Sequence, residues 1–96
     1  EPYESQAIGG GYIGRHNIPG LGAGFVPENY NPYIVDAVMA VPSHTANVTA
    51  REVLETDAIP ASPSAGAVLT AAHQLMAEHP DLKRVVCVFA GQVLYE

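Results

Sequence analysis

The first third of the chain most restricts how it can fold, because roughly 30 residues run there without any periodic apolar pattern. This stretch contains the run Gly20–Gly24, in which glycine and alanine predominate. Such a backbone can turn through positive φ angles and approach a bound small molecule closely. Loops of this length are uncommon inside compact domains, and where they occur they are often functional. The segment therefore predicts either a plain flexible turn or a loop that borders a binding site.

The glycine run does not match the dinucleotide-binding fingerprint. It lacks the required glycine spacing, no strand-like run precedes it, and Pro27 prevents a helix from following at once. Metal and hydrolase patterns are missing too: the histidines include no i, i+4 pair, and no Gly-x-Ser-x-Gly elbow accompanies Ser43 and His44. We therefore expect the histidines to lie singly on the surface. Cys87, within an apolar run, is expected to be a buried small hydrophobe.

Beyond Pro32 the chain alternates between apolar runs and helical periodicity. The expected elements are a buried strand at 35–41, a helix at 45–56 with Ser43 as its N-cap, an extended connection or edge strand at 57–63, a helix from the N-cap Ser64 to Glu78, and a buried strand at 85–89. Strands that alternate with helices predict an α/β fold with a mostly parallel sheet. Two firm strands and one weak one would leave both edges of that sheet exposed, so another chain or self-association is expected to cover them.

Composition limits the size of the fold and the class of partner. The chain has 96 residues, which is one domain at most, and only 15% of them are charged, which indicates that part of its surface is covered. A net charge of −6 argues against nucleic acid and anionic membranes as partners. No apolar stretch reaches the roughly 18 residues needed to span a bilayer, and no signal-peptide pattern opens the chain. We expect a cytoplasmic protein.

Residues Gly14–Asn29 resemble the loop of the cysteine synthase family, the pyridoxal-phosphate enzymes that make cysteine from an activated serine and sulfide. The similarity extends through nearly the whole chain. It continues at Glu1-Pro2 with Ser5, at Val35-Asp36 with Val38, at Thr49-Ala50-Arg51, and at Ile59, Ala61 and Ser64–Ala67. The resemblance implies the C-terminal third of a fold type II enzyme: part of the three-layer large domain, with residues 1–33 as a loop segment at the active-site mouth and residues 34–96 as its strands and helices.

The resemblance also assigns roles to residues of this chain. Gly20, Gly22 and Ala23 correspond to the family loop that borders the substrate side of the cofactor and moves over the bound amino acid. Ser64 and Gly66 open a helix as the family's turn does, either as an N-cap or as indirect support on the cofactor side. Ala90 and Gly91 replace the turn where family members carry a serine or threonine that hydrogen-bonds the pyridine nitrogen. Neither has a hydroxyl, and the turn is shorter.

The family's lysine has no counterpart here. Pyridoxal-phosphate enzymes hold the cofactor as a Schiff base on a lysine, and the only lysine, Lys83, stands in a charged turn where a solvated position is expected. The phosphate-binding loop is also absent from the sequence. Two hypotheses follow. The chain is part of a β-replacement enzyme acting on O-acetylserine or a similar β-substituted alanine, complete only with another chain or an N-terminal portion. Alternatively, it is a non-catalytic remnant or interaction module that has lost the cofactor.

Overall fold

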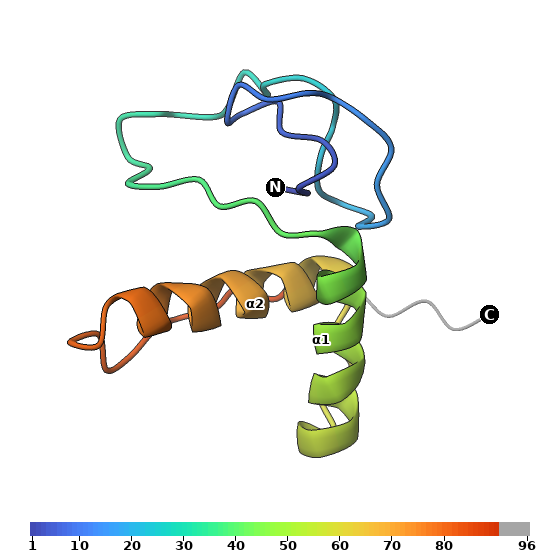
Figure 1. The fold of residues 1–96 in the computed structure, drawn as a ribbon, viewed down its shortest axis with the longest axis vertical. Helices are drawn as coiled ribbons and strands as arrows, with labels where there is room; N and C mark the ends of the chain where they lie inside the picture. The colour runs from blue at the N-terminus through green and yellow to red at the C-terminus, as the bar shows by residue number, and fades with distance from the viewer. Residues whose placement is uncertain (91–96) are drawn as a thin grey trace.

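The computed structural model describes residues 1–90 and contains two helices, α1 (Ser43–Asp57) and α2 (Pro63–Glu78). The N-terminal 42 residues form an irregular segment that folds back on itself, lies above α2 in the view of Figure 1 and leads into the N-terminal end of α1. Both helices were expected from the sequence, and their periodicity is confirmed. Among the described residues, neither helix combines the length and apolarity that crossing a bilayer requires.

Helix α1 buries Ala46, Ala50 and Val53, the positions that its helical periodicity places on one face. Its N-cap is Pro42 and not Ser43, so the expected cap was wrong by one residue. Proline offers no side-chain acceptor, and the Ser43 N–H instead donates to both carboxylate oxygens of Glu4, at 3.0 and 3.2 Å. The negative charge of the carboxylate also interacts favourably with the positive end of the helix dipole at this N-terminus.

Helix α2 begins two residues earlier than expected. Its N-cap is Ser62, whose hydroxyl oxygen accepts from the Ala65 N–H at 3.2 Å, and Pro63 occupies the first helical position. The assignment of Ser64 as N-cap was therefore wrong. Proline has the φ angle of a first-turn residue and no N–H that needs a partner, so the cap precedes it.

The two helices cross at Gly66. A Cβ atom at this position would collide with the carbonyl oxygen of Ala46 and lie 2.9 Å from the amide nitrogen of Ala50. Beside the crossing, the hydroxyl oxygens of Thr70 and Thr49 lie 2.9 Å apart. All the buried alanine, valine and isoleucine residues except Ala72 form two small clusters, one of Ile18, Val41, Ala46 and Ala67 and one of Ala50, Val53, Ala61 and Ala65. The core of the described region therefore relies on close approach of backbones and not on large side chains.

The expected three-layer sheet is not present in residues 1–90. One isolated parallel bridge joins Pro2 to Val41, and the rest of 35–41, which bends at Asp36, and all of 85–89 are irregular without a ladder. The expected burial of the last strand is wrong as well, since Val86 is 91% exposed and Val88 75% exposed, and Cys87 is only half-buried. A strand forms only where a neighbour accepts and donates its backbone hydrogen bonds. Residues 85–89 have no such neighbour within the described part of the chain, and 35–41 has one only at its end, where Val41 and Met39 hydrogen-bond residues 1–3.

Candidate functional site

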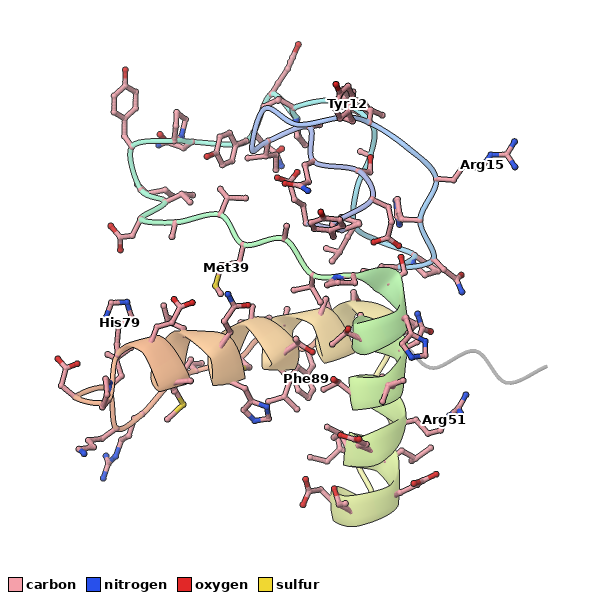
Figure 2. The ribbon with its side chains drawn as sticks, viewed as in Figure 1. Tyr12, Arg15, Met39, Arg51, His79 and Phe89 are labelled. Carbon is pink, nitrogen blue, oxygen red and sulfur yellow. The ribbon has the colours of Figure 1, made fainter. Side chains whose placement is uncertain are left out.

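An open cleft of about 710 Å³ lies where the glycine loop meets the start of α2. Its lining includes Gly20 and Leu21 from the loop, Arg51 from α1, Ser62 and Ser64 from the start of α2, and Ala90. The apolar lining comes from leucine, valine, proline and alanine side chains. Arg51, which also lines the cleft, extends outward from α1 (Figure 2). The cleft thus combines the glycine backbone of the loop with hydroxyl groups at a helix N-terminus.

The three predicted loop residues occupy different positions. Gly20 lines the cleft with φ +96°, and no atom lies within 4 Å of the place where its Cβ would be. Gly22 has φ +62° and lies behind this surface, where a Cβ would approach the His16 ring to 2.6 Å and Pro2 to 2.9 Å. Ala23 is exposed and is not part of the lining. Of the three, only Gly20 borders the cleft in this arrangement.

His16 contacts the loop through both ring nitrogens. Its Nε2 lies 2.9 Å from the carbonyl oxygen of Gly22, and the Ile18 N–H donates to its Nδ1 at 3.1 Å. The ring is half-buried, so the expectation of a surface histidine was wrong here. Its spacing from Ile18 and Gly22 matches no known motif, and the sequence carries no signal for this arrangement.

The loop is attached to α1 by its residue Asn17. The Asn17 N–H donates to the Ser43 hydroxyl at 2.8 Å, and the Asn47 side-chain amide donates to the Asn17 carbonyl at 2.9 Å. The same serine hydrogen-bonds Glu4, and this hydrogen bonding lowers the pKa of Glu4 by more than partial burial raises it. The positive charge of the His16 ring in its doubly protonated form lowers that pKa further, by a smaller amount. Three segments distant in the sequence therefore meet at the N-terminus of α1.

At the start of α2, two serine hydroxyls converge on one carbonyl group. Ser62 Oγ lies 3.0 Å and Ser64 Oγ 3.4 Å from the Ala90 carbonyl oxygen, and the two hydroxyls are 2.9 Å apart. Ser64 and Ala90, both predicted for the cofactor side, are thus brought together, and Ser62 joins them although the sequence did not single it out. Gly66 lies at the helix crossing and not in the lining. Gly91 lies outside the described residues.

The described residues alone do not provide a pyridoxal-phosphate site. The lining contains Arg51 but no lysine, and Lys83 is exposed in the turn after α2, with its Nζ 3.4 Å from the Pro80 carbonyl oxygen. In residues 1–90, no group of three or more histidine, cysteine, aspartate or glutamate side chains is placed to hold a metal ion. We therefore assign no covalent step to this part of the chain.

No protein-family model matches the chain, but individual proteins do. It is 40% identical over 88 residues to cysteine synthase from Staphylococcus aureus, a match that covers 92% of this chain and 28% of that protein. It is 39% identical over 89 residues to cysteine synthase A from Escherichia coli, covering 91% of this chain and 28% of the relative. The chain therefore spans little more than a quarter of the length of these curated relatives.

Solved structures agree with the sequence matches. A crystal structure of cysteine synthase from Entamoeba histolytica superposes with a TM-score of 0.79 at 37% identity, over 84% of this chain and 24% of that one. O-acetyl serine sulfhydrylase isoform 3 from the same organism gives a TM-score of 0.72 at 38% identity, over 74% of this chain and 21% of that one. From identity along nearly its whole length and a shared backbone arrangement, we conclude that the chain belongs to the cysteine synthase family, as a fragment of that family's larger fold.

Proposed function

We propose that this chain supplies the substrate-side loop and a supporting helix pair of a pyridoxal-phosphate-dependent β-replacement enzyme. The enzyme would convert O-acetylserine, or a similar β-substituted alanine, and sulfide to cysteine. The observation that carries the proposal is that Gly20, Ser64 and Ala90 line one cleft. The family resemblance assigns Gly20 to the substrate side and Ser64 and Ala90 to the cofactor side, so residues of both sides line the same cleft.

Catalysis requires a further part of the fold in this proposal. The cofactor provides an electron sink for carbanion chemistry once a lysine holds it, and that lysine comes from outside this chain because Lys83 lies away from the cleft. The irregular segments at 34–38 and 85–89 support the same division, since they carry β-prone residues without strand neighbours in the described region. The chain's own contribution is to cover a small amino-acid substrate and exclude water from it.

Reconstitution tests this proposal. The chain is co-expressed with the part of Escherichia coli cysteine synthase A that lies outside the match, and each part is also expressed alone as a control. We expect a complex with a visible absorption band from bound pyridoxal phosphate and with cysteine formation from O-acetylserine and sulfide. A folded complex that binds cofactor but forms no cysteine would contradict the catalytic proposal.

A second candidate function has a specific observation in its favour. Ala90 offers a backbone carbonyl, already engaged by Ser62 and Ser64, where family members present a hydroxyl to the pyridine nitrogen. A chain with that change fits a non-catalytic module that has kept the family fold and binds a partner chain. Native mass spectrometry of the reconstituted material distinguishes the two functions, because a stable complex without cofactor supports the module and a cofactor-loaded complex supports the enzyme. A cytoplasmic location is part of both proposals.

A further inference from the structure

We infer that His16 is a positioning residue that holds the glycine loop closed at its base, so that Gly20 and Leu21 remain at the cleft. The functional meaning of this role rests on the proposed function, because only that proposal assigns the loop to a substrate. The closure itself follows from contacts within the chain, independently of any ligand.

The two hydrogen bonds define the protonation of the ring. Nδ1 accepts from the Ile18 N–H, so it carries no proton, and Nε2 must then carry the proton that it donates to the Gly22 carbonyl. Each nitrogen of a neutral imidazole can play only one of these roles. The contacts therefore select the Nε2-protonated neutral form.

The residues at the two contacts fit a closed loop. Ile18 is fully buried in the small core, which anchors the first contact, and the Leu21 N–H donates to the Ile18 carbonyl at 3.1 Å to form a turn inside the loop. Gly22 at the second contact lies against the imidazole so closely that a Cβ would stand 2.6 Å from Nε2. The ring thus bridges the start and end of the turn and fills the space beneath it.

Other roles for the imidazole fit less well. Both ring nitrogens are already engaged, and His16 does not line the cleft, so it is not placed to exchange a proton with a bound molecule. No three metal-binding side chains gather around it or elsewhere in the described ranges. Its contacts are therefore those of a residue that shapes the loop.

The first test measures the tautomer on the unmodified chain. Nitrogen-15 NMR of the imidazole distinguishes a protonated from a bare Nδ1, and we expect the His16 signal to show a bare Nδ1 and a protonated Nε2 in the folded chain. A His16 ring protonated at Nδ1, or one that exchanges between the two tautomers, would overturn the inference.

The second test separates the two hydrogen bonds. In His16→Asn the side-chain oxygen can replace Nδ1 as acceptor for Ile18, whereas in His16→Gln the terminal amide can replace Nε2 as donor to Gly22. We expect the Leu21 amide to exchange with solvent about three- to tenfold faster in His16→Asn, and the Ile18 amide to do so in His16→Gln. His73→Gln, an exposed change on α2, serves as the matched control.

The amides of α1 and α2 report whether each variant is folded. Unchanged Ile18 and Leu21 exchange in both folded variants, or equal acceleration in the His73 control, would refute the role of His16. If both substitutions unfold the chain, the tautomer measurement alone decides. Since neither test requires cofactor or substrate, the inference and the proposed function can fail separately.

Discussion

Replacing Gly66 by alanine should loosen the helix crossing and lower the stability of the fold substantially. The added Cβ would meet two backbone groups of α1, the Ala46 carbonyl and the Ala50 amide, and neither can move aside as a flexible side chain would. Overpacking of this kind costs about 1–3 kcal/mol, and a backbone obstacle places the change near the upper end. Alanine recovers about 1 kcal/mol of helix propensity. We therefore expect a net loss of about 2 kcal/mol.

That loss is large for a chain of this size. A domain of 96 residues has a total stability of roughly 5–14 kcal/mol, and 2 kcal/mol lowers its melting temperature by about 8–16 °C. Urea denaturation followed by circular dichroism measures the change in the free energy of unfolding. Gly10→Ala is the control, because Gly10 has φ +79° but open space around it, so alanine there costs only about 1 kcal/mol of backbone strain.

A second variant tests whether the obstacle is the backbone of Ala46 and not its side chain. Ala46→Gly removes a side chain but leaves the carbonyl that obstructs the new Cβ, so the double variant with Gly66→Ala should show no relief. The reasoning would be refuted by a Gly66→Ala chain as stable as the original, or by a double variant more stable than Gly66→Ala alone.

Three further predictions concern the two helix N-termini and the lysine. Because folding lowers the pKa of Glu4, its carboxylate stabilises the fold above the unfolded-state pKa, and this contribution is lost as pH falls through the folded-state pKa. Glu4→Gln should therefore flatten the dependence of the urea midpoint on acidic pH, and an unchanged pH profile would contradict this prediction. Ser62→Ala should cost about 1 kcal/mol through loss of the α2 cap and the contact with Ala90, and Ser64→Ala should cost less in the same urea titration. Lys83→Ala should leave cofactor absorbance of the reconstituted complex unchanged, and loss of the band would show that Lys83 does hold the cofactor.

The helices could be predicted because their information is local. In α1, the residues Ala46, Ala50 and Val53 repeat at helical spacing within one short segment, and no distant residue is needed to make that face apolar. The start of α1 was missed for the opposite reason. Glu4 caps the helix from 39 residues away, and no sequence pattern near Ser43 indicates this contact.

The predicted strands were wrong because these segments lack adjacent strands to pair with. Residues 85–89 have strand composition, but composition fixes no partner, and the described residues supply no ladder for them. The family resemblance singled out Gly20, Ser64 and Ala90, which line the cleft, but their roles there stay predictions. It could not identify His16, because the two contacts of that ring depend on the path of a loop with positive-φ glycines.

The hydrogen bonds that hold the N-terminal segment also set an order of folding. The Thr70–Thr49 contact at the helix crossing closes 21 residues, whereas Glu1 to Met39 closes 38 and Glu4 to Ser43 closes 39. The Asn17–Ser43 bond that attaches the glycine loop closes 26 residues, a length between these. Short closures cost less chain entropy and form sooner, so we expect the helical hairpin to assemble first, the glycine loop to dock next and the N-terminal residues to dock last. The loop proposed to cover the substrate is then acquired only after the helices have formed, and denaturant is expected to release it before it unfolds them.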